Sequence, residues 1–406
     1  MKLYKKIMII LFLIIIFMYV CNITLLPNGI ILMQGETLNL NTIFGIKVGK
    51  IEENQQILQT SSNLNKSKVN DLGKLDLNLN LFGKISLKEM TVNVIPKTTV
   101  IPMGKAIGMK LYTKGVLVVG MSEIEGKKPY ENSGIKEGDM ILKINQEDIN
   151  TTNELMTTVN QCNGNEIKIT YQREEEVTTT SIKPVKTDDN EYKLGLWVRD
   201  AAAGVGTMTF YEPSSKMFAS LGHGITDIDT SELIEIANGE LVTTNILSIV
   251  KGEKGTPGEI RGTIENGISL GNIYKNTRFG IYGRILNSTR LNLSEKEEVE
   301  VALRNEIDTG KAEILCELED GKTEKYEIEI QKLFINNNRD NKSMVIKITD
   351  KRLLEKTGGI IQGMSGAPIL QNGKFVGAVT HVLVNDPTAG YGVFADIMIK
   401  QMREVT

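Results

Sequence analysis

Hydrophobic and polar residues alternate over short stretches through most of the chain, and glycine or polar residues separate these stretches. Residues 75–81 (LDLNLNL) alternate with strict period two, which predicts a half-buried strand. From residue 194 to the end, short apolar runs such as 205–210 and 344–348 are punctuated by glycine, and few stretches have a helical period. This pattern predicts a mainly β protein in which residues 187–406 form an all-β barrel or sandwich.

The longest apolar stretch lies near the start of the chain. It covers residues 7–20, follows three lysines within the first six residues, and extends toward residue 26. As a helix rising about 1.5 Å per residue, residues 7–26 are long enough to cross a bilayer. Lysines mark the cytoplasmic side, and no small-residue cleavage site follows. We therefore expect a signal-anchor transmembrane helix over residues 1–26, with everything after Pro27 outside the cytoplasm; a removed signal or lipidation of Cys21 are the alternatives.

Residues 99–186 have the pattern of a compact unit with strands and one short helix. Residues 133–145 read SGIKEGDMILKIN, which puts glycine at the turns and apolar residues on one strand face. A helical stretch follows over residues 152–159, with Thr152 as the expected N-cap. The unit resembles the PDZ domain (α+β) of bacterial proteases. The residues before it, 27–98, are expected to form a small β module or stalk.

The resemblance to PDZ domains implies a peptide-binding site. In that family a loop presents backbone N–H groups to the carboxylate that ends a peptide, and the peptide adds as a strand beside the residues that follow. The matching residues here are Ile107, Gly108 and Met109. We expect the unit to bind a substrate peptide or a segment of its own chain. A PDZ fold that only packs against its neighbour is the alternative.

Composition narrows the classes of function. A net charge of -3 over 406 residues offers no basic surface, so we do not expect nucleic-acid binding. The hydrophobic share of 41% and charged share of 24% are those of a globular protein, and the length suggests two or three domains. We expect no disulfide framework, no bound metal and no other cofactor, because three cysteines form no C-x-x-C pair and no cluster with histidine: Cys21, Cys162 and Cys316.

A glycine-rich turn contains the candidate nucleophile. Residues 358–368 read GGIIQGMSGAP, so Ser365 has Gly363 two positions before it and Gly366 directly after it. Such a turn can present the hydroxyl to a substrate carbonyl while the N–H groups of Gly363 and Ser365 point at the oxyanion that forms. On this motif alone, a loop whose serine bonds its own backbone is the slightly favoured explanation.

Two histidines, His223 and His381, are the only sources of an imidazole. His223 lies between two glycines, which leaves its ring open to solvent and to a neighbouring hydroxyl, so we prefer it as the base. His381 lies within a predicted strand, where a packed or paired histidine is the commoner explanation. Asp350 ends the strand predicted over residues 344–349 and could orient the imidazole. Spacing alone does not separate it from the other candidates, Asp227, Asp229 and Asp386.

Several of these motifs occur in an order that resembles one family, the stage IV sporulation protein B serine peptidases of endospore-forming bacteria. The motifs are GHGI (222–225), VKGEKGTPG (250–258), TD (349–350), GMSGAP (363–368) and AVTHV (378–382). The resemblance places the family's catalytic residues on His223, Asp350 and Ser365. It implies a trypsin-like double β-barrel that follows a PDZ domain and an N-terminal membrane segment.

The family's function follows as an expectation. An enzyme of this kind is a serine endopeptidase exported into the space between the two membranes around the forespore. It cleaves itself near its N-terminal region and cuts the extracytoplasmic part of a membrane regulator that restrains an intramembrane protease. Release of that protease activates a late sigma factor. The alternative is a catalytically inactive PDZ adaptor, or docking protein, in the same compartment.

Overall fold

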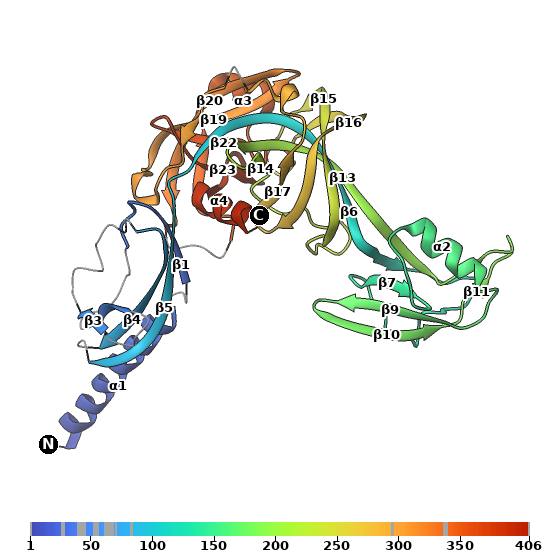
Figure 1. Ribbon diagram of the computed structural model, residues 1–406, viewed down its shortest axis with the longest axis horizontal. Helices are drawn as coiled ribbons and strands as arrows, with labels where there is room; N and C mark the ends of the chain where they lie inside the picture. The colour runs from blue at the N-terminus through green and yellow to red at the C-terminus, as the bar shows by residue number, and fades with distance from the viewer. Residues whose placement is uncertain are drawn as a thin grey trace. The chain divides into compact units, whose positions relative to one another are not determined.

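Two compact units make up the chain in a computed structural model, and each is built mainly of β-strands (Figure 1). The N-terminal unit is Met1–Thr98 with Leu303–Ile307, and the C-terminal unit is Thr99–Ala302 with Asp308–Thr406. The structure describes residues 2–25, 29–38, 46–51, 57–60, 69, 71–81, 84–293, 296–335 and 340–404. Parts of the predicted membrane segment (1–26) and of the predicted β module (27–98) therefore lie outside the described residues.

The N-terminal unit contains a five-stranded sheet with the order β1-β5-β4-β2-β3. Its strands are β1 (Gly29–Met33), β2 (Ile46–Ile51), β3 (Ile57–Thr60), β4 (Gly73–Leu81) and β5 (Ile85–Ile95). The alternating run forms β4, as predicted, and Leu77 and Leu79 are fully buried in the core of this unit. Asn78 and Asn80 on the other face are buried as well, and Asn78 Oδ1 accepts a hydrogen bond of 2.8 Å from Ser86 Oγ. This end of the strand is thus buried on both faces, which the alternation did not predict.

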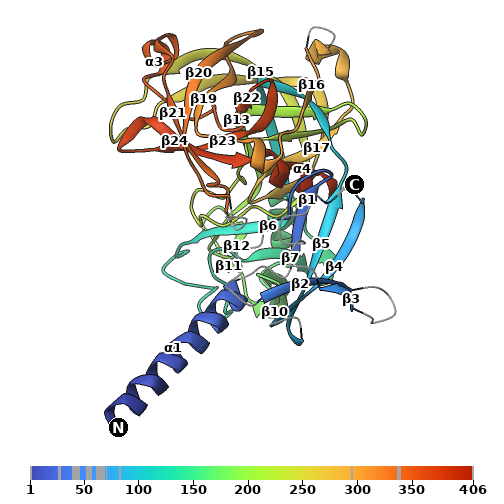
Figure 2. The ribbon, with the colours of Figure 1, turned by 90° about the vertical axis from the view of Figure 1, so that its left-hand side faces the viewer.

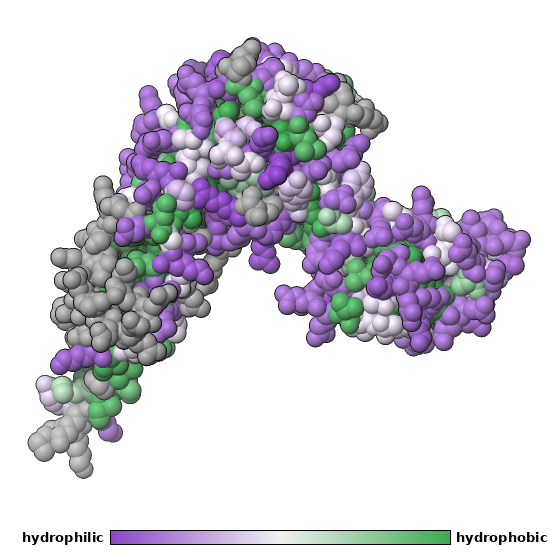
Figure 3. All heavy atoms as spheres, viewed as in Figure 1, coloured by the Kyte–Doolittle hydropathy of each residue, from purple (hydrophilic) through white to green (hydrophobic). Residues whose placement is uncertain are grey.

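The first helix, α1 (Lys2–Leu25), covers the apolar stretch near the start of the chain. Most of its described apolar side chains are exposed, among them Ile9, Leu11 and Phe17. Hydrophobic atoms of this helix are visible on the surface in Figure 3. Within the part of the chain that the structure describes, we find no helix with the length and apolar character that crossing a membrane requires.

The first part of the C-terminal unit is a closed circuit of six strands, which we call the strand ring. They are β6 (Thr99–Met121), β13 (Leu196–Glu212), β14 (Met217–Ser220), β17 (Gly280–Ile285), β16 (Glu259–Thr277) and β15 (Ile236–Val250). Each strand pairs with the next, and β15 pairs with β6 as well as with β16, so the pairing returns to its start. The core inside the strand ring includes Met103, Ile107, Phe218, Leu241 and Ile273. The short strand β18 (Val299–Glu300) pairs with the start of β6, and a 3-10 turn, η2, spans Ser288–Leu291.

The second part is a closed six-stranded barrel with the order β19-β20-β21-β24-β23-β22 (Figure 2). The strands are β19 (Gly310–Glu319), β20 (Lys322–Leu333), β21 (Met344–Ile348), β22 (Pro368–Gln371), β23 (Lys374–Leu383) and β24 (Asp386–Phe394). In β20, the side chains of Tyr326, Ile328 and Ile330 are buried while Glu327 and Glu329 between them are exposed, the period-two pattern of a barrel wall. Helix α3 (Lys351–Thr357) connects β21 to the segment before β22, and α4 (Ala395–Arg403) follows β24 and contacts β23. The predicted mainly β fold with a C-terminal barrel is confirmed.

Between β6 and β13 the chain folds into the predicted PDZ unit. Its elements are β7 (Met140–Ile144), β8 (Glu147–Asp148), α2 (Thr152–Gln161), β9 (Ile167–Arg173), β10 (Glu176–Ile182), β11 (Val185–Lys186) and β12 (Tyr192–Lys193). Its own core joins Val116 and Ile141 to Leu155 and Val159 of α2. The sequence predicted Thr152 as the N-cap of α2. The observed N-cap is Thr151, which makes a capping box with Glu154.

Strands β6 and β13 belong to both the strand ring and the PDZ sheet. Their pairing runs from Ile101 with Tyr211 in the strand ring to Met121 with Leu196 in the PDZ sheet. That sheet has the order β10-β9-β7-β6-β13. Residues 99–113, which the sequence assigned to the PDZ unit, therefore supply a strand of the strand ring.

Candidate active site

Ser365 lies in the turn between α3 and β22, where backbone contacts from two strands hold it. The amide of Thr207, in β13, donates to the Ser365 carbonyl at 3.2 Å, and the Gly366 amide donates to the carbonyl of Val379, in β23, at 2.8 Å. A Cβ on Gly366 would stand 2.3 Å from the Thr207 carbonyl oxygen, and its φ is +95°. The residue after the candidate nucleophile must therefore be glycine. The Ser365 hydroxyl donates to the Thr380 carbonyl at 2.9 Å.

The predicted oxyanion donors, Gly363 and Ser365, have free amides. Among the described residues, no hydrogen bond uses the backbone N–H of either one. Gly363 has a φ of +97°, and its carbonyl is turned away to accept a bond of 2.6 Å from the Thr207 hydroxyl. Two unused amides two residues apart beside a serine hydroxyl are what stabilisation of an oxyanion requires. Their role as oxyanion donors stays a prediction.

His223 follows β14 in a tight turn. Leu221 and Gly222 before it both have positive φ, 69° and 68°. The half-buried imidazole donates from Nδ1 to the carbonyl of Gly224 at 2.8 Å, so its neutral form carries the lone pair on Nε2. Burial lowers the pKa of His223, and the bond to Gly224 partly offsets this effect. The imidazole is therefore neutral at pH 7 and able to accept a proton.

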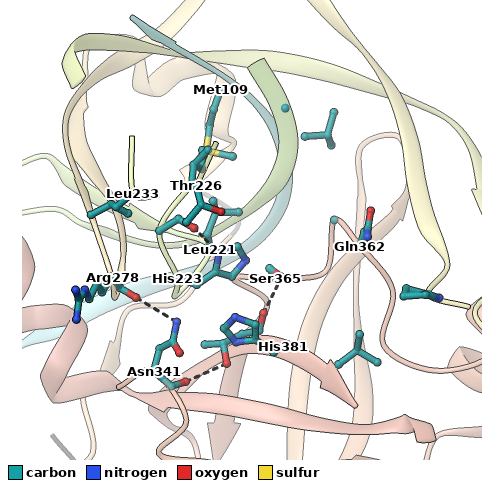
Figure 4. Close-up of a pocket in the computed structure, with 18 of the residues that line it drawn as sticks. Met109, Leu221, His223, Thr226, Leu233, Arg278, Asn341, Gln362, Ser365 and His381 are labelled. Atoms are coloured by element: carbon teal, nitrogen blue, oxygen red, sulfur yellow. Dashed lines mark hydrogen bonds between the residues drawn. The ribbon is translucent and has the colours of Figure 1, made fainter. Parts of the chain in front are cut away.

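His381, in β23, lies directly beside His223. The centroids of the two imidazoles are 5.1 Å apart and their planes are inclined by 39° (Figure 4). The Nδ1 of His381 is buried and has no hydrogen-bond partner among the described residues. Burial, and then the nearby His223 and Lys342, lower the pKa of His381 to about 4, while Asp340 acts in the opposite direction. The sequence suggested a packed strand histidine, but the imidazole belongs to the candidate site.

These three side chains line one pocket of about 1090 Å³. Figure 4 shows Ser365 beside the two imidazoles. The apolar Leu221 and Leu233 and the polar Arg278 and Asn341 also line the pocket. The walls come from both the strand ring and the barrel of the C-terminal unit. The volume is sufficient for several side chains of a bound peptide.

The structure places Asp350 at the start of α3, away from the pocket that contains His223. Its side chain caps the N-terminus of α3 by accepting from the Arg352 amide at 2.9 Å. The Arg352 guanidinium bonds both carboxylate oxygens, and the Glu327 amide reaches one of them at 3.3 Å. The hydrogen bond to Arg352 is the main reason that the pKa of Asp350 is lowered. Asp350 is absent from the lining of the pocket that contains His223, and its oxygens serve the helix terminus instead.

The predicted peptide-binding loop, Ile107, Gly108 and Met109, is contradicted. These residues lie in the middle of β6, where Ile107 and Met109 are fully buried. At Gly108 the strand pairs with Val205 of β13 on one edge and with Val242 of β15 on the other. A peptide cannot add as a strand to an edge that is already paired.

Residues 190–399 match the SpoIVB peptidase S55 family, and residues 103–183 match the PDZ domain family. The chain belongs to the SpoIVB peptidase S55 family. The S55 match covers more than half of the chain and contains Ser365, His223 and His381 of the pocket. The protein is therefore a serine peptidase with a PDZ domain, as the motifs predicted.

More distant similarities cover parts of the chain. One relative, "Putative zinc metalloprotease CPE1693" from Clostridium perfringens, is 22% identical over 165 residues, which are 38% of this chain; the chain spans less than half, 46%, of that relative's length. The PDZ domain of the SdrC-like protein from Listeria monocytogenes is 18% identical over 21% of this chain and 87% of its own, with a TM-score of 0.19. The Rv3671c protease in an inactive form is 12% identical over 50% of this chain and 84% of its own, with a TM-score of 0.28.

The structure places the predicted residues Ser365, His223 and Gly363 in one pocket, and it adds His381, which the sequence did not place there. The signal that could have found it is the scarcity of histidine: the chain has two, and both lie in one pocket. Thr207, which holds the carbonyls of Gly363 and Ser365 in place from another strand, carries no sequence signal at all.

Proposed function

We propose that this S55 peptidase is an endopeptidase in which Ser365 is the nucleophile and His223 the general base, while the amides of Gly363 and Ser365 bind the oxyanion. The strand ring and the barrel would then correspond to the two barrels of a trypsin-like enzyme, with the site between them. The proposal is supported by the composition of one pocket. It joins a serine in a glycine turn, a neutral imidazole with a free Nε2, and two unused amides.

The chemical steps follow from these groups. The Ser365 hydroxyl rotates away from the Thr380 carbonyl and gives its proton to His223 Nε2 while Oγ bonds to the substrate carbonyl carbon. The carbonyl π pair moves to oxygen, where the two amides stabilise it. His223 then gives the proton to the leaving amine as the C–N bond breaks, and a water repeats the sequence on the acyl-enzyme.

A fluorophosphonate probe tests the nucleophile. We expect the full-length enzyme to be labelled and Ser365→Ala to show no labelling, because the probe bonds only to an activated serine. Ser343→Ala, which changes a buried serine outside the pocket lining, is the matched control and should label normally. Absence of labelling in the wild type, or labelling that survives Ser365→Ala, would favour the inactive PDZ adaptor.

The biological role that we propose comes from the family. The enzyme would act outside the cytoplasm, held at the membrane through residues 7–26, cleave itself near its N-terminal region, and cut the extracytoplasmic part of a membrane regulator of an intramembrane protease, which leads to activation of a late sigma factor. Family membership and the apolar run near the N-terminus support this proposal. Retention of the full chain by alkali-washed membranes, and loss of regulator cleavage in Ser365→Ala, are the expected results. Release of the full chain by alkali would exclude the anchor.

We also infer that the PDZ unit binds a peptide, from a substrate or from its own chain. The edge of β13 at Leu196–Arg199 pairs with β6 on one side only among the described strands. Helix α2 begins beside it, with the Thr152 amide donating to Asp200 at 2.7 Å. Trp197 on this edge is the single tryptophan of the chain and is 63% exposed. Titration with a peptide of residues 395–404 should change its fluorescence, and an unchanged spectrum would argue against own-chain binding there.

A further inference from the structure

We propose that His381 is a positioning residue for His223, occupying the place that the sequence assigned to Asp350. The proposal rests on the proposed function of Ser365 and His223 and adds a third group to it. Both imidazoles line the pocket that contains Ser365, and they face each other across 5.1 Å (Figure 4). In the described residues no carboxylate contacts the His223 imidazole, whose Nδ1 is bonded to Gly224 instead.

The separation of the imidazoles is that of a pair able to form a hydrogen bond. Two imidazoles joined by an N–H···N bond of about 2.9 Å have centres about 5 Å apart. The observed centroid distance of 5.1 Å is nearly the same, although the planes are inclined by 39° and no such bond is formed. The proposed bond therefore requires the two imidazoles to reorient about their own side-chain bonds.

The buried Nδ1 of His381 is the acceptor that such a bond needs. It has no partner among the described residues, and a buried polar atom left unpaired destabilises a fold. A residue that served only to pack β23 would be better replaced by an apolar ring of the same size. The destabilising effect of the unpaired Nδ1 of His381 is explained if this nitrogen accepts a hydrogen bond from His223 when His223 becomes protonated.

The charged groups around His223 and His381 favour a state in which only one of the two imidazoles is protonated. Lys342 and Asp340, from the segment before β21, act on His381 in opposite directions, and Arg278, from the turn between β16 and β17, lines the same pocket. His223 disfavours protonation of His381, because a second positive charge at this distance is repelled. His381 therefore stays neutral and accepts a hydrogen bond while His223 carries the proton.

In the proposed catalytic step, one proton moves from Ser365 through His223 to the leaving amine. Ser365 gives its proton to His223 Nε2 as the Oγ–C bond forms, so the imidazolium has two N–H groups. The Nδ1–H, which neutral His223 donates to Gly224, is then shared with the lone pair of His381. His381 takes no proton and forms no covalent bond. When the leaving amine receives the Nε2 proton and the C–N bond breaks, both imidazoles are neutral again.

His381→Phe is the main test, because phenylalanine preserves an aromatic ring and removes both nitrogens. We expect the thermal midpoint to stay level or rise, while the rates of fluorophosphonate labelling and of p-nitrophenyl acetate hydrolysis by the full-length enzyme fall about 10²-fold. His381→Asn, whose amide oxygen can accept the same N–H, should stay within about tenfold of the wild type. If the Phe variant does not fold, the smaller His381→Leu takes its place. Wild-type rates in the folded apolar variant would overturn the proposal.

Asp350→Asn is the matched comparison. Asparagine caps helices as well as aspartate, so α3 should remain, and we expect rates within about threefold of the wild type. In an established Ser-His-Asp site the same change lowers kcat about 10⁴-fold, so a loss larger than that of His381→Phe would overturn the proposal. Ser365→Ala separates the two failures. If labelling does not depend on Ser365, the proposed function is wrong, whatever the histidine variants do.

A second readout does not depend on turnover. Because the chain has two histidines, one variant assigns both imidazole resonances in NMR spectra. We expect His223→Asn to raise the pKa of His381, since a neighbour that can become positive is removed. Imidazoles that only pack together would titrate independently, and an unchanged titration of His381 would contradict the pairing.

Discussion

At the scale of single residues, the site is built from groups that are kept neutral. The hydroxyl of Ser365 bonds a carbonyl, and both imidazoles have lowered pKa values because the pocket buries them. A neutral imidazole is the form that can take a proton, so burial prepares the base at neutral pH. Asp350 shows the opposite case, where a carboxylate is kept charged by its bond to Arg352 and serves the helix rather than the pocket.

The buried imidazoles make stability depend on pH. The pKa of His381 is about 4 in the folded chain and about 6.5 when exposed, so between these values the unfolded chain binds more protons. We expect the free energy of unfolding to be fully retained above about pH 6.5 and to fall as the pH is lowered toward 4. Urea unfolding of wild type and His381→Phe across this range measures it, and the variant should depend less on pH. Equal slopes would mean that His381 is not buried in its neutral form.

At the scale of elements, the pairing of β6 explains why residues 107–109 do not form a peptide-binding loop. The motif around Gly108 has the glycine and apolar pattern of a carboxylate-binding loop, but both edges of the strand there are paired. A Cβ on Gly108 would approach side-chain atoms of Ile264 and Val242 to 2.9 Å. The glycine is therefore required by close packing inside the strand ring, not by a ligand.

Gly108→Leu tests this assignment. The added side chain must displace Ile264 and Val242, so we expect a loss of about 1–3 kcal/mol of stability, with labelling of Ser365 and peptide binding reduced together as the folded fraction falls. Thermal unfolding followed by labelling measures both. Gly126→Leu, in a turn with open space around it, is the control for a change in a glycine, although its φ of +71° adds some strain. Normal stability with a selective loss of peptide binding would restore the original assignment.

At the scale of the whole molecule, the PDZ unit and the peptidase share two strands. The chain enters the strand ring through β6, leaves it for the PDZ sheet, and returns through β13, and the pairing between these strands is continuous apart from bulges. Thr207 and the pocket residues 202–205 lie on β13, so the strand that contacts the turn of Ser365 also forms the edge of the PDZ sheet. A peptide bound at that edge would therefore contact the same strand as the active site.

Truncation at the predicted domain boundary tests this organisation. A fragment of residues 187–406 lacks β6, so β13 and β15 each lose a paired neighbour and core residues such as Ile107 are missing. We expect this fragment to unfold without cooperativity, whereas residues 99–406 unfold cooperatively. Thermal unfolding followed by near-ultraviolet circular dichroism distinguishes them. A cooperative transition in the shorter fragment would show that the strand ring does not need β6.

The sequence by itself determined the features that depend on local pattern. Period-two alternation predicted β4, glycine punctuation predicted a C-terminal barrel, and the glycines around Ser365 predicted a tight turn, which the positive φ of Gly363 and Gly366 shows. These succeed because strand alternation and turn glycines are set by neighbouring residues along the chain. The order of several motifs also identified the family, which no single motif could do.

Only the tertiary structure decided which distant groups meet. His381 looked like a packed strand residue, yet it lies against His223, which is 158 positions away by their numbers (381 − 223). Asp350 looked like a catalytic acid, yet Arg352, two residues later, binds it. Gly108 looked like a peptide-binding loop until both edges of its strand were found to be paired. In each case the deciding contact depends on strand pairing and barrel closure across long separations, and such contacts leave no regular signal in the local sequence.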